Sequence, residues 1–207
     1  MKDMPKVLEL NAGDHFDLER NSYVCDYITR IDQYDFEFEN LEQYDVLLLT
    51  DFVDQEYLYE NKEKIEKFLS EKKIVIFCGT MFRKVLPGQT FFMPKKIKNH
   101  NDYMVKATPN NPIFEGVIAE EMVYRKGVAG FFARGYYYPP KNAEILLGFL
   151  DDKVITYIDR ENSDGTMLVH AGANLFQYKN RANTTYKIEE NLIKWIVNEL
   201  KRLRGEE

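Results

Sequence analysis

The sequence is poor in cysteine and histidine, and this scarcity excludes several classes of protein. Only two cysteines, Cys25 and Cys78, occur in 207 residues, which is too few for the disulfide scaffold of a small secreted domain. The three histidines, His15, His100 and His170, form neither an HxH nor an HExxH pattern. The sequence therefore predicts no metal site, and a reducing, cytoplasmic environment is the expectation.

Long apolar runs and an excess of basic charge are also missing. No window approaches ~18 apolar residues, and the opening MKDMPKVLEL contains no apolar h-region, so we expect neither a membrane span nor a signal peptide. A net charge of −6 argues against a general nucleic-acid binder, which needs a concentrated basic surface. No GxGxxG fingerprint is present, and the sequence predicts no cofactor.

The chain is rich in apolar and aromatic residues. It is 44% hydrophobic and 30% charged, a composition that supports a packed core, and its length fits a single domain, 1–207. The 14 Tyr and 14 Phe residues are many for an ordinary domain. Since such rings are common in pockets and interfaces, we expect some of them to contact a ligand or a partner.

Strands and helices alternate in the first half of the sequence. Continuous Val and Leu runs such as VLLL indicate parallel strands buried on both faces, and the segment 54–73 has acidic residues early and lysines late, as a helix dipole favours. We expect strands at 6–10, 35–39, 46–49 and 74–79, with helices at about 15–29 and within 54–73. This order predicts a three-layer, flavodoxin-like α/β fold with a mostly parallel sheet.

The second half has a different character. The segment 81–102 contains two prolines, a glycine and no regular period, which indicates a long loop or lid. Strand-like runs separated by turn signals follow it and predict a β-rich segment with antiparallel or mixed strands. These runs are 102–108, 121–127, 131–138, 143–150, 153–160 and 165–172. A final helix at 185–203 has one apolar face and is expected to dock on the sheet.

Polar residues follow the predicted parallel strands where each strand ends. Ligands of open α/β sheets bind at these carboxyl ends. The candidate ligand-binding residues are Asn11, Gly13, Asp14, Asp51, Gly79 and His170. Asp14 also suits the N-cap of the expected helix, whose first backbone amides could hold an anion.

Cys78 and His170 stand at two of these strand ends, and each has two interpretations. A neighbouring imidazole can take the proton of a thiol and stabilise the thiolate, so the pair suits nucleophilic catalysis. The backbone N–H of Gly79 would then face a developing oxyanion. Alternatively, Cys78 is a small apolar residue packed at a strand end, and His170 has a structural or ligand-contacting role.

Four segments resemble the class I glutamine amidotransferase-like superfamily, and within it the ThuA-like branch. They are YDVLLLTDF, KIVIFCG, VKATPNNPIFEGV and GTMLVHAGANLFQY, the last of which is followed by the final helix. The resemblance covers most of the chain. It implies the same α/β fold and, in active members, a cysteine nucleophile paired with a histidine.

The chain departs from the pattern of active amidotransferases at both catalytic motifs. Their nucleophile elbow has the form Gly-x-Cys-x-Gly, whereas Ile76 and Thr80 stand at the two glycine positions here. Their histidine belongs to a His-Pro-Glu motif, whereas His170 is followed by Ala171 and Gly172. A bulky elbow packs poorly, and an imidazole without an orienting carboxylate loses its preferred tautomer unless Asp164 or another acid replaces it.

Two further stretches are candidates for interaction surfaces. Five basic residues and no acid lie between Met81 and Lys98, alternating with Phe and Met. This stretch is either a solvated loop or a lid or docking surface for an acidic partner. The second stretch, 130–140, groups five aromatic residues around Arg134. Some of these rings are expected to face outward as an interface or a stacking surface.

Three hypotheses of function follow. The preferred one is a divergent, non-catalytic member of the superfamily that binds a small polar ligand or a protein partner at the carboxyl ends of its strands. The first alternative is a cysteine-dependent hydrolase or amidotransferase that uses Cys78 and His170. The second alternative is a structural subunit of a larger assembly, with homo-oligomerisation through the aromatic surface as one form of it.

Overall fold

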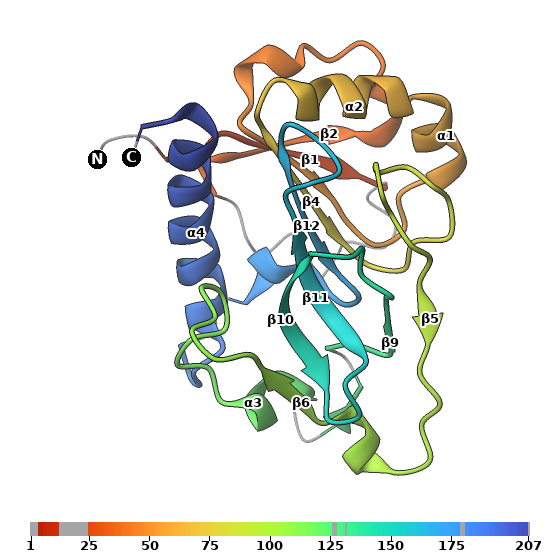
Figure 1. Cartoon of the computed structure of the whole chain (residues 1–207), viewed down its shortest axis with the longest axis vertical. Helices are drawn as coiled ribbons and strands as arrows, with labels where there is room; N and C mark the ends of the chain where they lie inside the picture. The colour runs from red at the N-terminus through yellow and green to blue at the C-terminus, as the bar shows by residue number, and fades with distance from the viewer. Residues whose placement is uncertain (1–3, 13–24, 126–127, 131, 179–180, 207) are drawn as a thin grey trace.

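A sheet of eight strands forms the centre of the molecule (Figure 1). The computed structural model describes residues 4–12, 25–125, 128–130, 132–178 and 181–206. The strand order is β2-β1-β3-β4-β12-β11-β10-β6. In that order the strands are Ile28–Asp32, Val7–Asn11, Val46–Leu49, Ile74–Cys78, Thr166–His170, Val154–Asp159, Glu144–Phe149 and Val105–Ala107.

The sheet has a parallel part and an antiparallel part. The neighbours β2, β1, β3, β4 and β12 pair in parallel, whereas β11, β10 and β6 continue the sheet in antiparallel pairs. The prediction of an α/β protein with a mostly parallel sheet and a β-rich second half is therefore confirmed. The strand arrangement is compatible with a flavodoxin-like fold.

The central strands form the core because their side chains are apolar on both faces. Every residue of β3, β4 and β12 is buried, as expected for parallel strands covered on both sides. The α-helices are α1 (Gln55–Glu60), α2 (Lys62–Ser70), α3 (Ala119–Val123) and α4 (Tyr186–Arg204). None of the helices in the described part of the chain is long and apolar enough to cross a membrane.

The C-terminal helix α4 forms where the sequence predicts it and packs against the sheet (Figure 1). Its apolar stripe is buried, namely Ile188, Leu192, Trp195, Ile196, Leu200 and Leu203. The helix ends at Gly205, whose φ of 69° is the left-handed conformation that favours glycine. Glu199 faces β12, where its carboxylate accepts a hydrogen bond of 2.6 Å from Thr166 Oγ1.

Two expectations for the first half are wrong. Residues 35–39 form no strand, because β2 ends at Asp32, whose carboxylate accepts the N–H of Tyr34 and caps a 3-10 helix, Gln33–Asp35. The expected helix cannot run to residue 29, since β2 begins at Ile28, and 13–24 lie outside the described residues. The segment 54–73 forms two helices, separated at Asn61.

The second half contains shorter elements than the sequence predicts. The run 121–127 lies partly in α3 and then enters β7 (Tyr124–Arg125), which pairs with β8 (Val128–Ala129). The run 131–138 contributes only β9 (Gly135–Tyr136), and its partner is β5 (Met93–Pro94), inside the predicted loop. Three further 3-10 helices of the described residues are Leu41–Gln43, His100–Tyr103 and Leu175–Gln177.

Candidate functional site

The parallel strands bring most of the predicted site residues to one edge of the sheet. Cys78 is the register partner of His170, and Leu49, two residues before Asp51, is the partner of Phe77. Asn11 ends β1 at the same edge. Gly13 and Asp14 lie outside the described residues. The carboxyl ends of β1, β3, β4 and β12 therefore form the candidate site.

Cys78 is completely buried at this edge. Burial raises the pKa of its thiol to about 12, helped by the negative charges of Asp51 and Glu9, while the backbone N–H of Leu175 acts in the opposite direction. No hydrogen bond joins the thiol to His170 within the described part of the chain. The thiol is consequently protonated at neutral pH, and His170 does not accept its proton through a hydrogen bond.

His170 is equally buried and also neutral. Burial lowers the pKa of its imidazole to about 3. Its Nδ1 lies 2.7 Å from Thr156 Oγ1, and the ring packs edge-on against Phe132 with 5.2 Å between ring centroids. Its Nε2 has no hydrogen-bond partner among the described residues, an uncommon condition for a buried polar atom. The orienting group is the hydroxyl of Thr156, and no carboxylate of the described residues takes that role.

Gly79 does not present a free oxyanion donor. Its backbone N–H donates to the carbonyl of His170 at 2.9 Å, so the expectation that this N–H faces an oxyanion is wrong for this structure. Its φ is 146°, and a Cβ at this position would overlap the carboxylate of Asp51. Glycine is therefore required here because the Asp51 side chain packs directly on the backbone.

A loop, and not a helix, follows Cys78, so the strand-to-helix elbow of an amidotransferase is absent. Two side chains that sequence analysis missed fix this loop. Tyr137 donates its hydroxyl proton to Gly79 O (2.8 Å) and accepts the N–H of Met81 (3.0 Å). Gln55 donates to Thr80 O (2.6 Å) and accepts the N–H of Phe82 (2.8 Å). The aromatic stretch that contains Tyr137 was a candidate surface from the sequence alone, and nothing in the sequence indicated a role for Gln55.

Phe52, directly after Asp51, has a backbone conformation that is rare for a bulky residue. Its φ is 71°, and 62% of its surface is exposed. Left-handed conformations of non-glycine residues store strain and are concentrated at ligand sites and active sites. Phe52 is thus a second unusual backbone position, beside Gly79, at the same edge.

Glu9 brings a buried carboxylate close to the site. It lies in the middle of β1, and its Oε2 accepts a hydrogen bond of 2.8 Å from Arg30 Nε. Its Oε1 accepts a longer one of 3.4 Å from Asn174 Nδ2. The ion pair with Arg30 compensates the burial of the carboxylate. The sequence gave no sign of it because Glu9 lies within an apolar strand.

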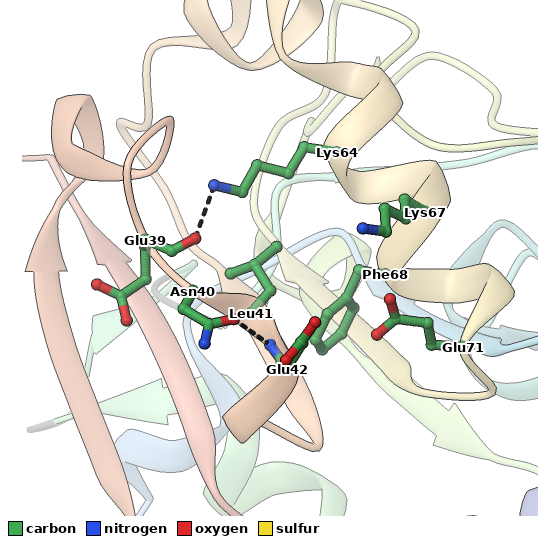
Figure 2. A pocket seen from close by; sticks show the side chains of 8 residues that line it. All are labelled: Glu39, Asn40, Leu41, Glu42, Lys64, Lys67, Phe68 and Glu71. Carbon is green, nitrogen blue, oxygen red and sulfur yellow. Dashed lines mark hydrogen bonds between the residues drawn. The ribbon is translucent and has the colours of Figure 1, made fainter.

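A surface pocket of about 230 Å³ lies at the opposite end of the sheet (Figure 2). Its residues come from the segment before β3 and from α2 and the residue after it: Glu39, Asn40, Leu41, Glu42, Lys64, Lys67, Phe68 and Glu71. Lys64 Nζ donates to the carbonyls of Phe36, Glu37 and Glu39 at 2.6–2.8 Å. This lysine therefore holds the preceding loop in place, and the pocket contains charges of both signs.

Metal binding finds no support in the part of the chain that is described, where no group of three or more His, Cys, Asp or Glu side chains is placed to hold an ion. No protein-family model matches this chain, and no curated protein matches its sequence significantly. The resemblance to the amidotransferase-like superfamily therefore rests on its sequence motifs alone.

Proposed function

We propose that this chain is a divergent, non-catalytic protein of the class I glutamine amidotransferase-like kind, with a three-layer, flavodoxin-like arrangement, and that it acts in the cytoplasm. Its role is to bind a small polar ligand at the carboxyl ends of β1, β3 and β4. The observation that carries the proposal is the state of Cys78 and His170, which are both buried, both neutral and not hydrogen-bonded to each other.

This state is unfavourable for cysteine catalysis. A thiol with a pKa of about 12 is ionised in only about one molecule in 10⁵ at pH 7, and the thiolate is the reactive form. An imidazole with a pKa of about 3 is a weak base at the same pH. The N–H of Gly79 is already used by His170 O. An acyl transfer requires a nucleophile, a base and an oxyanion donor, and the corresponding groups Cys78, His170 and Gly79 N–H are all in states that do not favour it.

The same edge has the features of a binding site. Asn11 and Asp51 are half-buried polar residues at adjacent strand ends, and Asp51 is held against the backbone of Gly79. The strained, exposed Phe52 follows Asp51 directly. A polar ligand would be bound by the amide and carboxylate, with the aromatic ring beside it. His170 is completely buried at the end of the neighbouring strand β12, in register with Cys78.

Alkylation of Cys78 tests the non-catalytic part of the proposal. Iodoacetamide labelling is followed against pH in a Cys25→Ser background. We expect labelling in the native state to be slow and to increase only well above pH 9, because the buried thiol stays protonated. Rapid labelling with a transition near neutrality, lost in a folded His170→Ala variant, would instead establish the cysteine-dependent hydrolase.

Thermal-shift screening with a panel of polar metabolites tests the binding part. A ligand is expected to stabilise the wild type and Cys78→Ser equally, and Asp51→Asn is expected to weaken it about tenfold or more. Asp164→Asn is the matched control, since this exposed carboxylate precedes β12 at the other end of the sheet. Equal binding by the Asp51 and Asp164 variants would place the ligand elsewhere.

A further inference from the structure

The pocket at the amino end of the sheet keeps its shape because two lysines fasten one of its walls (Figure 2). Lys64 Nζ, on α2, donates to three backbone carbonyls of the wall segment 36–42. Lys73 Nζ, just before β4, donates to the carbonyls of Leu41 at 2.9 Å and Glu42 at 3.3 Å. Five hydrogen bonds from charged donors thus hold this wall. The pocket is preformed, as small-molecule sites usually are.

The floor of the pocket is apolar, and its size suits a small molecule. The buried side chains of Leu41 and Phe68 line it. Its volume is about 230 Å³, whereas a water molecule in the liquid occupies about 30 Å³, so the pocket admits a ligand of roughly eight to ten non-hydrogen atoms. A sphere of this volume is about 8 Å across, so one small ligand can reach both facing walls.

Most of the charged groups around the pocket are bonded within the protein. The ammonium of Lys64 is bonded to backbone carbonyls. Glu71 Oε2 lies 2.9 Å from Lys73 Nζ, and the carboxylate of Glu39 accepts the hydroxyl proton of Tyr44 at 3.1 Å. These groups hold the pocket together, so they are not the ones that select a ligand.

Two opposite charges that line the pocket have no such partner. Lys67, on α2, and Glu42, on the wall that faces α2, are exposed, and neither forms an ion pair in the part of the chain that the structure describes. Figure 2 shows the ammonium of Lys67 directed into the hollow between α2 and the segment that contains Glu42. A molecule with one anionic and one cationic group of its own can therefore pair with both walls at once.

We propose that this pocket binds a small zwitterion, namely an α-amino acid with an apolar side chain. The carboxylate of the ligand pairs with Lys67, its ammonium pairs with Glu42, and its side chain lies on Leu41 and Phe68. Three carboxylates and, with Lys73, three ammonium groups surround the pocket, so a ligand without net charge fits it better than an anion or a cation. The site is separate from the carboxyl ends of the strands and does not depend on the function proposed for them.

Titration of the full chain, followed by the backbone amide signals in NMR spectra, tests this site. The probes are L-leucine and two matched analogues: isoamylamine, which lacks the carboxylate, and isocaproate, which lacks the ammonium. We expect leucine to shift the signals of Glu42 and Lys67 along a saturable curve. Each analogue is expected to bind at least tenfold more weakly, because it loses one of the two charged contacts.

Substitutions of the two unpaired residues sharpen the test. Lys67→Gln and Glu42→Gln are each expected to weaken the binding of leucine at least tenfold. Glu66→Gln is the matched control, since Glu66 is an exposed acid of α2 that does not line the pocket, and it is expected to have no effect. The double exchange of Lys67→Glu with Glu42→Lys keeps one charge of each sign, so it is expected to recover binding with the amino acid reversed.

Three outcomes would overturn the proposal. The first is the absence of any saturable shift up to about 20 mM leucine, a concentration that detects even millimolar affinity. The second is an analogue that binds as tightly as leucine, because the pocket would then use only one of its two charges. The third is leucine that shifts Asn11 and Thr50 and binds equally well to the Lys67→Gln variant, which would assign the amino acid to the carboxyl ends of the strands.

Discussion

The two ends of β12 bury polar clusters that are built in different ways. At the amino end, Thr166 donates to the carboxylate of Glu199, which also accepts bonds from Arg160 Nε (2.8 Å) and Arg202 NH2 (2.8 Å). At the carboxyl end, four residues along the strand, the His170 ring bonds Thr156 through Nδ1, and its Nε2 has no partner in the described part of the chain. The first cluster is saturated with hydrogen bonds, and the second is not.

The difference shows two ways in which a fold accommodates a buried ionisable group. Burial opposes ionisation of Glu199, but the bonds from Arg160, Arg202 and Thr166 outweigh it and lower the pKa of this carboxyl. His170 has no such partners, and burial lowers its pKa until the group is neutral. The amino end therefore fastens α4 to the sheet, whereas the carboxyl end buries a neutral imidazole whose Nε2 has no partner among the described residues.

Replacing Glu199 is expected to have the largest effect on stability. Glu199→Gln removes the buried charge that two arginines share, so that Arg160 keeps only its ion pair with Glu144 and Arg202 keeps its hydrogen bond to Thr166 Oγ1. Breaking such a pair is expected to lower the free energy of unfolding by about 3 kcal/mol at pH 7. Urea denaturation of both proteins measures the difference. Because the folded pKa of Glu199 is lowered, this contribution is present above pH ~4.5 and is lost as the pH falls further.

The exposed pair of Arg181 and Glu190 provides the control. Its NH2 and Oε1 atoms are 3.1 Å apart, and the arginine side chain is largely in solvent. Glu190→Gln should therefore cost less than about 0.5 kcal/mol. If both substitutions gave similarly small losses, the Glu199 cluster would not be the structural anchor described here.

Most of the fold could be predicted from local patterns. Apolar runs located β1, β3, β4 and the three long strands of the second half, and the apolar stripe from Ile188 to Leu203 located α4. Residues 35–39 were wrongly predicted to be a strand because Phe36 and Phe38 alternate with acidic residues, as in a half-buried strand. Only Phe36 is buried there, and Phe38 belongs to a turn. The Asp32 side chain ends the strand by capping the 3-10 helix that follows it. Hydrophobic periodicity cannot indicate this hydrogen bond.

The candidate site could be predicted in position but not in chemistry. Parallel strands must bring Cys78 and His170 to one edge, so their register partnership follows from the topology. Their protonation does not, because it depends on complete burial by segments distant in sequence. Thr156 and Gln55 carried no signal, since a hydroxyl or an amide contacts such a site only through the tertiary fold.

The pH dependence of stability should reveal His170 as the next largest effect. Between pH ~6.5 and ~3 the unfolded chain binds a proton that the folded imidazole does not. The free energy of unfolding is therefore expected to fall with decreasing pH by about 1.4 kcal/mol per unit, or about 2 kcal/mol between pH 7.5 and 5. This window lies above the pH range in which the contribution of Glu199 changes. Urea denaturation measured at several pH values between 7.5 and 5 gives the change in the free energy of unfolding per pH unit.

His100→Gln is the matched control for this slope, because His100 is exposed in a 3-10 helix. The slope should survive in His100→Gln and disappear in His170→Gln. Should the latter variant fail to fold, NMR titration of the wild-type imidazole answers the question directly. A His170 signal that titrates near pH 6.5 would show that the ring is not the buried neutral group inferred here.

A matched pair of threonine substitutions compares the two ends of β12 at the smallest scale. Thr166→Val removes a hydroxyl that donates to a carboxylate, and Thr156→Val removes a hydroxyl that is hydrogen-bonded to Nδ1 of a neutral imidazole. Hydrogen bonds to charged groups contribute about twice as much as neutral ones, so we expect losses of about 2 and about 1 kcal/mol. Both hydroxyls are fully buried, which removes solvent exposure as a cause of any difference. If Thr156→Val proved as costly as Thr166→Val, the carboxyl end would be as firmly built as the amino end. The unpartnered Nε2 would then be a packing compromise in an otherwise firmly built cluster.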